Sequence, residues 1–203
     1  MDTPNGLAEL YLIRHGETDW SLSGRHTGRS DVALTTRGEQ EAEALGARWR
    51  HLVFDHVFTS PRLRARRTCE LSGWAGGAEV DEDLAEWDYG DYEGLRSRDI
   101  QVDRPEWSLF HDGCPGGESP AQVAIRADRL IERLRKLTGR VAVFSHGHFS
   151  RAVGVRWIGL PVAEGRHFAL GTASLSVLGY EHGLLERSAI LHWNVMGICS
   201  TRH

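Results

Sequence analysis

The sequence predicts an α/β fold, namely a three-layer α/β/α sandwich around a mostly parallel sheet. Short apolar segments at residues 9–14, 56–60 and 141–145 alternate with segments of helical periodicity. This alternation is typical of a parallel sheet covered by helices. Two of the apolar segments end in the same dipeptide, His-Gly, at His15 and at His146. At 203 residues the chain has the length of one domain with a sizeable core, so we expect a single domain over 1–203.

The first half of the chain predicts three strands and two helices. After the strand at 9–14, Thr36 and Glu39 match a capping box, and apolar side chains then recur at helical spacing at Ala42, Leu45, Trp49 and Leu52. The segment HVFTS predicts a second strand at 56–60. Ser60 is expected to cap a helix that has Pro61 at its first position and extends to about Gly73. A short strand is expected near 78–80.

The second half begins with a loosely patterned region, 81–118, in which we expect long connections and one or two short helices. Ser119, Pro120 and Gln122 then open the clearest helix of the chain. Its buried stripe is predicted at Val123, Ala127, Leu130, Leu134 and Leu137, and Gly139 is expected to end it. A strand at 141–145, a helix at about 149–158 and strands near 173–180 and 187–193 complete the prediction.

Composition restricts the class of protein. The formal net charge of −4 gives no indication of nucleic-acid binding, and no apolar segment reaches the length of a membrane span. The cysteines, Cys69, Cys114 and Cys199, are odd in number and lack metal-site spacing, which is typical of a reducing compartment. We therefore expect a cytoplasmic protein with neither nucleic acid nor membrane as a partner.

The polar residues that follow the predicted strands indicate a site. In a parallel sheet, ligands bind beyond the carboxyl ends of the strands. Arg14, His15, Arg64 and His146 follow three such ends and would form an electropositive pocket that suits a phosphate group. A neutral His15 is a competent nucleophile toward phosphorus, and neighbouring cations disfavour its protonation. The glycine after it lets the backbone pass close to the phosphate.

A phosphoryl transfer to His15 also needs an acid for the leaving alcohol. Glu86 is the best candidate, because Trp87 and Tyr89 stand beside it and would desolvate it. Other carboxylates of the same region compete with it: Glu82, Asp83, Asp88, Asp91 and Glu93. Spacing alone does not choose among them.

Five motifs in order, RHGET, SPRLRA, LAEWDYG, GGES and SHG, resemble the histidine phosphatase superfamily in its phosphoglycerate-mutase-like branch. The resemblance extends from about Leu10 to Arg151. The wording of the motifs is most similar to phosphatase members of the sedoheptulose-bisphosphatase and broad acid phosphatase type. It implies the phosphoglycerate-mutase-like fold, no cofactor and no metal. By analogy with the family it also implies a possible homodimer.

The resemblance assigns roles to individual residues. It implies that His15 becomes a phosphohistidine, that Arg14 and Arg64 bind the phosphate, and that His146 holds the phosphoryl group during transfer. It also implies that Glu86 is the proton donor, which is the choice that spacing left open.

Substrate-binding residues are expected around this centre. Many relatives carry asparagine after the Trp of the first motif, where this chain has Ser21, whose hydroxyl still reaches a phosphate. Thr27, Gly28, Arg62, Gly147 and His148 are further candidates. The HGH spacing of His146 and His148 resembles a pair of metal ligands, but without a carboxylate partner we expect no metal there.

The sequence thus predicts a metal-independent, acid phosphatase-like phosphomonoesterase that acts on small phosphorylated metabolites at acidic to near-neutral pH. Glu86 and His146 are only 60 positions apart (146 minus 86), and a short lid, expected at 87–118, favours hydrolysis over phosphate return. A phosphoglycerate mutase is the alternative enzyme. A catalytically idle phosphate-binding or sensor module is the alternative from another class.

Overall fold

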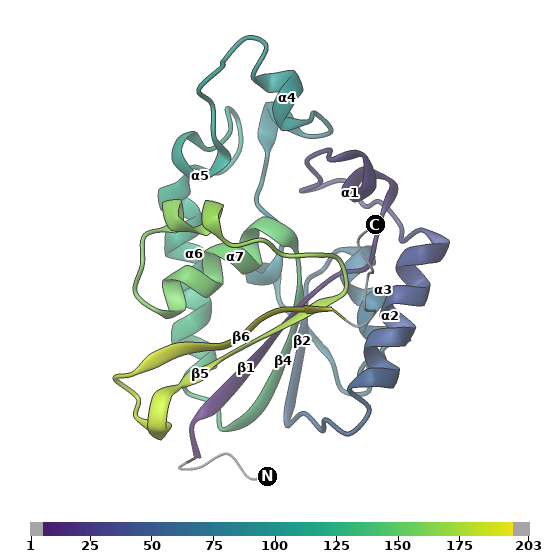
Figure 1. Cartoon of the computed structure of the whole chain (residues 1–203), viewed down its shortest axis with the longest axis vertical. Coiled ribbons are helices and arrows are strands. Elements are labelled where there is room, and N and C mark those ends of the chain that lie inside the picture. The colour runs from purple at the N-terminus through teal and green to yellow at the C-terminus, as the bar shows by residue number, and fades with distance from the viewer. Residues whose placement is uncertain (1–5, 197–203) are drawn as a thin grey trace.

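The computed structural model describes residues 6–196. Its centre is a six-stranded sheet with the order β3-β2-β4-β1-β5-β6 (Figure 1). The strands are β1 (Ala8–Arg14), β2 (His56–Thr59), β3 (Glu79–Val80), β4 (Gly139–Ser145), β5 (Ser174–Tyr180) and β6 (Ser188–Met196). The first four strands pair in parallel, whereas β5 and β6 are antiparallel to their neighbours. The predicted mostly parallel sheet is therefore confirmed.

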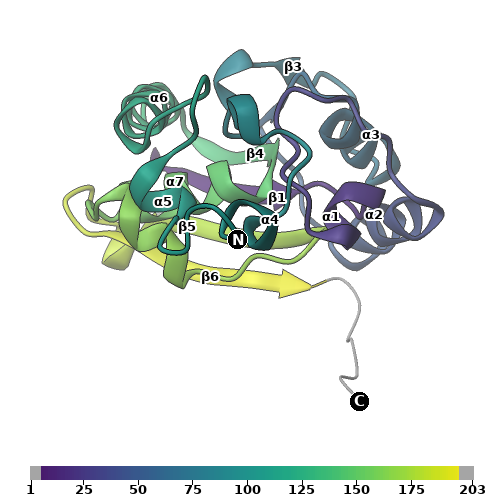
Figure 2. The ribbon, with the colours of Figure 1, turned by 90° about the horizontal axis from the view of Figure 1, so that it is seen from above.

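Helices cover both faces of this sheet (Figures 1 and 2). On one face lie α2 (Thr36–Arg48) and α3 (Leu63–Leu71), and on the other lie α6 (Pro120–Leu134) and α7 (Gly147–Trp157). Successive side chains of β1 alternate between the two layers, because neighbouring residues of a strand point to opposite faces. Leu12 packs in the α6/α7 layer, whereas Ile13 packs in the α2/α3 layer. The three-layer sandwich follows from this two-sided burial.

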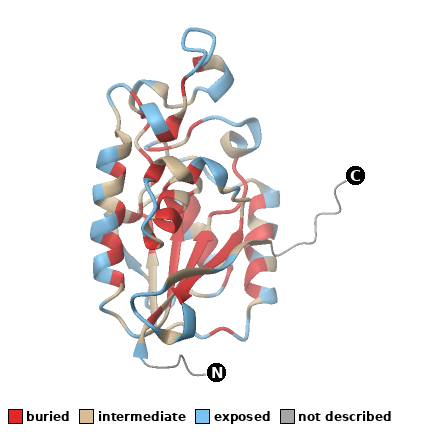
Figure 3. Cartoon of the chain, turned by 60° about the vertical axis from the view of Figure 1, so that its left-hand side comes forward, coloured by how far each residue is buried: buried red, intermediate tan, exposed pale blue. Residues whose placement is uncertain are grey.

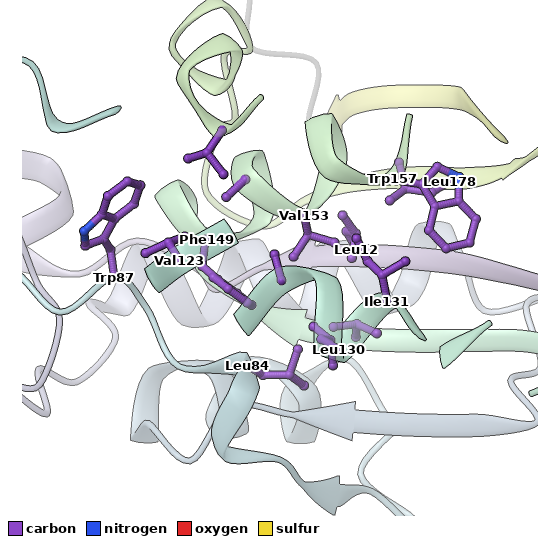
Figure 4. Close-up of a cluster of buried hydrophobic side chains, with 14 of the residues drawn as sticks. Leu12, Leu84, Trp87, Val123, Leu130, Ile131, Phe149, Val153, Trp157 and Leu178 are labelled. Carbon is purple, nitrogen blue, oxygen red and sulfur yellow. The ribbon is translucent and has the colours of Figure 1, made fainter. Parts of the chain in front are cut away.

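The larger core lies between the sheet and the α6/α7 pair, and Figure 4 shows part of it. It joins Leu12 of β1 to Leu130 of α6 and Trp157 of α7, and it also includes Trp87 from the loosely patterned region. Figure 3 shows the buried strands between helices whose outer faces are exposed. Both layers thus hold β1 and β4 rigidly, and these are the strands whose ends carry the two His-Gly turns.

Two predicted helix caps are wrong. Thr35, and not Thr36, caps α2, because its side-chain oxygen accepts a hydrogen bond from the amide of Gly38 at 3.0 Å. Ser60 does not cap α3, which begins at Leu63 with Arg62 at the cap position and no side-chain cap bond. The Ser60 hydroxyl instead lies 2.7 Å from the ring of His146. Ser60 therefore contacts the candidate site, and its hydroxyl also accepts from the amide of Arg62 at 3.3 Å, before the helix begins.

The helix α6 begins with the predicted capping box, in which Ser119 and Gln122 exchange hydrogen bonds. It ends at Leu134, earlier than predicted, and Gly139 does not end it. Gly139 is the first residue of β4 and has a φ of 79°. A Cβ there would lie 2.1 Å from the carboxylate of Asp55, so this position serves the entry into the strand.

The region 81–118 contains short helical elements only: η2 (Glu82–Leu84), η3 (Gly90–Tyr92), α4 (Ser97–Ile100) and α5 (Leu109–Asp112). The segment with α4 and α5 lies beyond the carboxyl ends of the parallel strands (Figure 1). Its role as a lid at 87–118 stays a prediction, as does the single-domain boundary 1–203. The remaining short elements are α1 (Asp19–Ser23), η4 (Val162–His167) and η5 (Glu181–Gly183). Within residues 6–196, no helix combines the length and apolarity needed to cross a membrane.

Candidate active site

The two His-Gly turns lie side by side because β1 and β4 are parallel neighbours in register. Arg14 pairs with Ser145, so that the next residues, His15 and His146, leave the sheet at the same edge. Their ring centroids are 5.3 Å apart, in an edge-to-face arrangement. The amide of His15 donates to the carbonyl of Ser145 at 3.1 Å and continues the pairing by one residue. The structure therefore brings together two imidazoles that are distant in the sequence.

One hydrogen bond determines the tautomer of His15. Its Nδ1 atom lies 2.7 Å from the carbonyl oxygen of Gly16. A carbonyl oxygen only accepts, so Nδ1 carries the proton and Nε2 keeps its lone pair. Burial lowers the pKa of His15 well below 6.5, and the charges of Arg64 and Arg14 lower it further. His15 is therefore a neutral imidazole with Nε2 as its nucleophilic atom.

His146 lies at the N-terminus of α7, and both of its ring nitrogens have partners. Nδ1 accepts from Nε of Arg64 at 3.2 Å, since a guanidinium can only donate. Nε2 therefore carries the proton and donates it to the Ser60 hydroxyl at 2.7 Å. Burial, followed by the charge of Arg64, lowers the pKa of His146 well below 6.5. His146 is thus a second neutral imidazole, with a fixed N–H.

Arg64 is fully buried, and its guanidinium organises a loop. Its terminal nitrogens donate to the carbonyls of Thr27 at 2.8 Å, Gly28 at 3.3 Å and Ser30 at 2.9 Å. The amides of the same loop donate to the carboxylate of Glu93, from Gly28 at 2.9 and 3.0 Å and from Ser30 at 3.0 Å. A guanidinium and a carboxylate thus hold this loop from opposite sides. The sequence alone presents Glu93 as a competing acid and does not indicate this structural contact.

A cavity of about 260 Å³ opens at this edge of the sheet. Among the sequence-predicted residues, those that line it are Arg14, His15, Ser21, Thr27, Glu86, Gly147 and His148. Arg64 and His146 are fully buried and do not line it. Gly28 and Arg62 line a separate cavity of about 240 Å³, whose wall also includes Glu86. The structure therefore assembles seven of the eleven predicted residues around one space.

Glu86 is held by backbone amides at the start of α7. Its carboxylate accepts from the amides of His148 at 3.0 Å and Phe149 at 2.8 Å, and from that of Trp87 at 2.9 Å. Tyr89 lines the same cavity, whereas Trp87 is buried in the core. The carboxylate is therefore fixed in position, on the wall that His15 also lines.

The other lining residues have defined local partners. The Ser21 hydroxyl exchanges hydrogen bonds with Thr18 in the capping box of α1. The Thr27 hydroxyl donates to the carbonyl of Arg25 at 3.2 Å. A Cβ at Gly147 would lie 3.3 Å from Nε of Arg14, so glycine permits their close approach.

Arg14 donates from its Nη1 atom to the carbonyl of Leu170, and its Nε atom is buried without a hydrogen-bond partner among the described residues. His148 accepts from or donates to the Tyr89 hydroxyl across 2.6 Å. The Nε of Arg14 is thus a buried donor whose hydrogen bond no described residue accepts, on a side chain that lines the cavity.

Four polar residues of the cavity wall were not predicted: Arg25, His26, Ser97 and Arg151. The loop at 24–27 and the segment around Ser97 meet through an isolated β-bridge between Arg25 and Arg96. Local sequence patterns do not predict this long-range contact. Arg151 follows His146 by five residues, on α7. Its place on the helix that begins at a predicted site residue is the feature of the sequence that indicates it. No group of three or more His, Cys, Asp or Glu side chains within residues 6–196 has an arrangement that holds a metal ion.

Comparison with known proteins identifies the family. Residues 10–195 match the histidine phosphatase superfamily (branch 1). An acid phosphatase of Mycobacterium tuberculosis is 47% identical over 89% of this chain and 91% of its own. A sedoheptulose 1,7-bisphosphatase of Saccharomyces cerevisiae is 38% identical over 79% of this chain and 71% of its own. A probable phosphoglycerate mutase GpmB of Salmonella choleraesuis is 31% identical, with 86% of each chain covered.

Solved structures agree with these relatives. The structure of the product of open reading frame Rv3214 of Mycobacterium tuberculosis covers 94% of this chain and 99% of its own, at 44% identity and a TM-score of 0.87. A phosphoserine phosphatase of Entamoeba histolytica in complex with 3-phosphoglyceric acid covers 93% and 98%, at 25% identity and a TM-score of 0.80. The chain therefore belongs to the histidine phosphatase superfamily, and the predictions of its phosphoglycerate-mutase-like fold and of a phosphatase enzyme are confirmed.

Proposed function

We propose that this phosphatase hydrolyses phosphomonoesters of small metabolites through a phosphohistidine on His15. The observation that carries the proposal is the fixed tautomer of His15, whose Nδ1 proton is bound by the Gly16 carbonyl. Nε2 is then the nucleophilic atom of a side chain that lines the cavity. Because the imidazole is buried and flanked by arginines, it stays neutral at acidic pH as well.

In the proposed reaction, Arg14 binds the phosphoryl group through its guanidinium, whose Nε atom has no hydrogen-bond partner within residues 6–196. Ser21, Thr27 and Gly147 surround the phosphate from the cavity wall. Arg64 and His146 stabilise its charge from beneath, through the guanidinium charge and through the Nε2 proton that Ser60 now accepts. Preorganised donors of this kind stabilise the charge that develops on the equatorial oxygens.

The chemistry proceeds in two steps. The Nε2–phosphorus bond forms as the ester bond breaks, and the leaving alcohol takes its proton from Glu86. A water molecule then gives a proton to the Glu86 carboxylate while its oxygen attacks phosphorus, so that the bond to Nε2 breaks and inorganic phosphate leaves. The first step needs a neutral His15 together with a protonated Glu86, so an acidic to near-neutral optimum is expected.

Substrate-binding roles for Gly28, Arg62 and His148 stay part of the proposal, as do a cytoplasmic location and a homodimer. The names of two relatives, acid phosphatase and sedoheptulose 1,7-bisphosphatase, support hydrolysis of small phosphorylated compounds. The GpmB relative keeps phosphoglycerate mutation as a second candidate. A phosphate sensor without turnover is the remaining alternative.

The test measures phosphate release in a chelator between pH 4.5 and 7.5 from an aryl phosphate, phosphoglycerate and two sugar bisphosphates. His15→Ala is compared with wild type and with His51→Ala, which changes an exposed histidine that does not line the cavity. Release by wild type and His51→Ala, with none by His15→Ala, supports the proposal. Interconversion of phosphoglycerates without net release indicates the mutase, and phosphate binding without turnover indicates the sensor.

A further inference from the structure

The carboxylate of Glu118, in the GGES motif, does not cap the helix that follows it. Ser119 holds the cap position of α6, and its hydroxyl accepts from the amide of Gln122. Both carboxylate oxygens of Glu118 instead accept from the guanidinium of Arg126, at 2.9 Å from Nε and 2.7 Å from Nη2. The side chains of Arg126 and Glu118 are only 12% and 19% exposed. The motif therefore supplies a largely buried ion pair that the chemistry proposed above does not use.

Arg126 holds the main chain that carries Glu86. Its Nη1 atom donates to the carbonyls of Asp83 at 2.9 Å and Ala85 at 2.7 Å. Its Nη2 atom donates to the carbonyl of Glu86 itself at 3.4 Å. With the two bonds to Glu118, each of the five N–H groups of the guanidinium has an acceptor. The guanidinium thus fixes the chain that leads to the proposed acid.

Glu118 holds the chain on the other side of Glu86. Its Oε2 atom accepts from the amide of Asp88 at 2.9 Å, and its own amide donates to the carbonyl of Asp88 at 2.9 Å. Its carbonyl also accepts from Nε1 of Trp87 at 2.9 Å. The ion pair therefore fixes the main chain both before and after Glu86.

The same guanidinium supports a donor of the Glu86 carboxylate. It lies 3.9 Å from the ring centroid of Phe149, whose amide donates to Oε1 of Glu86 at 2.8 Å. Oε1 also accepts from the amide of Trp87 at 2.9 Å, so both of its lone pairs are used. Oε2 accepts from the amide of His148 at 3.0 Å and keeps a second lone pair for a proton. Oε2 is therefore the oxygen that exchanges the proton in the proposed reaction.

A neighbouring arginine of α6 contacts the same segment in a different way. Arg129 donates to the carboxylate of Asp83 at 3.1 and 2.5 Å, and its side chain is 54% exposed. Exposed ion pairs of this kind contribute little to stability. Arg126, by contrast, is largely buried and reaches the main chain. The two arginines thus separate a contact with the backbone of Glu86 from an ordinary ion pair nearby.

We propose that Arg126 and Glu118 are positioning residues, which hold Glu86 so that its Oε2 proton reaches the leaving alcohol. The inference rests on the proposed function and deepens it. In the step concerned, the bond from phosphorus to the ester oxygen breaks as the bond to Nε2 of His15 forms, and Oε2 gives its proton to that ester oxygen. Proton transfer needs the two oxygens at hydrogen-bond distance, so a displacement of Glu86 slows this step although every group that touches the substrate is still present.

The test compares two aryl phosphates, phenyl phosphate and 2,4-dinitrophenyl phosphate. Phenoxide is a basic leaving group that needs the proton of Glu86, whereas dinitrophenolate is weakly basic and leaves without it. The measured quantity is kcat/KM for phenyl phosphate divided by kcat/KM for dinitrophenyl phosphate. Because kcat/KM includes only the steps up to release of the alcohol, the later hydrolysis of the phosphohistidine does not enter it. A smaller folded fraction lowers both values equally and cancels in the ratio.

Glu86→Gln is the reference and should lower this ratio by about 100-fold, the contribution of a general acid. Arg126→Met should lower it by about tenfold or more, whereas the matched control Arg129→Met should keep the wild-type ratio. Glu118→Gln should also lower it, and this variant decides the question if Arg126→Met does not fold. A double variant that combines Arg126→Met with Glu86→Gln should have the ratio of Glu86→Gln alone, because a positioning residue has no effect once the acid is absent.

The failure of this inference and the failure of the proposed function give different results. A wild-type ratio in Arg126→Met and in Glu118→Gln, while Glu86→Gln lowers it, would overturn the positioning role and leave the proposed reaction intact. An equal loss in Arg129→Met would also overturn it, since any disturbance of the segment would then have the same effect. A wild-type ratio in Glu86→Gln would remove the acid role of Glu86 and the inference with it.

Discussion

Replacing the buried His26 should reduce the acid sensitivity of the folded state. His26 is 5% exposed, lies 4.7 Å from Tyr89 between ring centroids, and has its pKa lowered from 6.5 to about 4. Burial is the main cause, and the charge of Glu93 opposes it. The imidazole thus stays neutral in the folded state at pH values where the unfolded chain binds a proton.

The sign and size of the effect follow from this difference. As the pH falls below 6.5, the unfolded state gains a proton that the folded state does not, so the free energy of unfolding falls. The loss continues until about pH 4 and amounts to about 1.4 kcal/mol per pH unit. Between pH 7.5 and 5.0 it reaches about 2 kcal/mol for His26 alone.

The assay is urea unfolding of wild type, His26→Gln and His51→Gln at pH 7.5 and 5.0. His26→Gln should lose about 2 kcal/mol less than wild type over this interval, whatever its stability at pH 7.5. His51→Gln, at an exposed position, is the matched control and should keep the wild-type loss. The buried His15 and His146 are common to all three proteins and cancel in the difference. His148 is also common to them, and the charge of His26 is only the third cause of its lowered pKa, after burial and Arg151. Equal losses in wild type and His26→Gln would refute the reasoning.

Three further outcomes are expected. Glu93→Ala should lower the free energy of unfolding by about 1–3 kcal/mol and reduce kcat/KM, because two loop amides lose their carboxylate acceptor. Glu93→Gln keeps an acceptor and should restore part of both quantities, measured by urea unfolding and by phosphate release. Arg14→Lys should reduce kcat by about 100-fold, because a single ammonium group replaces the paired N–H donors of a guanidinium. A wild-type rate of phosphate release would contradict the role of Arg14 in binding the phosphoryl group. Gly38→Ala should destabilise by about 1–3 kcal/mol although it lies in a helix, because its Cβ would lie 2.1 Å from the carbonyl of Glu17. Gly76→Ala, with nothing within 4 Å of the added Cβ, is its control by thermal unfolding.

Local patterns predicted the elements well, because residues within a few positions of each other mark where the strands and helices of this chain begin and end. The stripe of α6 and the apolar segments of β1 and β4 depend on side-chain periodicity, which is a property of the sequence itself. The wrong caps at Thr36 and Ser60 show the limit. A hydroxyl near a helix start has more than one available partner, and in the fold the Ser60 hydroxyl accepts a hydrogen bond from the ring of His146.

The sequence by itself determined which chemistry the protein carries: two His-Gly turns at strand ends, arginines near both, and an acidic segment between them. Register then brought His15 and His146 to 5.3 Å, as neighbouring parallel strands require. Only the tertiary structure decided that Arg64 faces loop carbonyls, that Glu93 holds the same loop from the other side, and that Arg151 lines the cavity. The hydrogen bonds of Arg64 and Glu93 to this loop join residues 34 to 65 positions apart, and their geometry depends on the packing of whole layers and not on any local pattern.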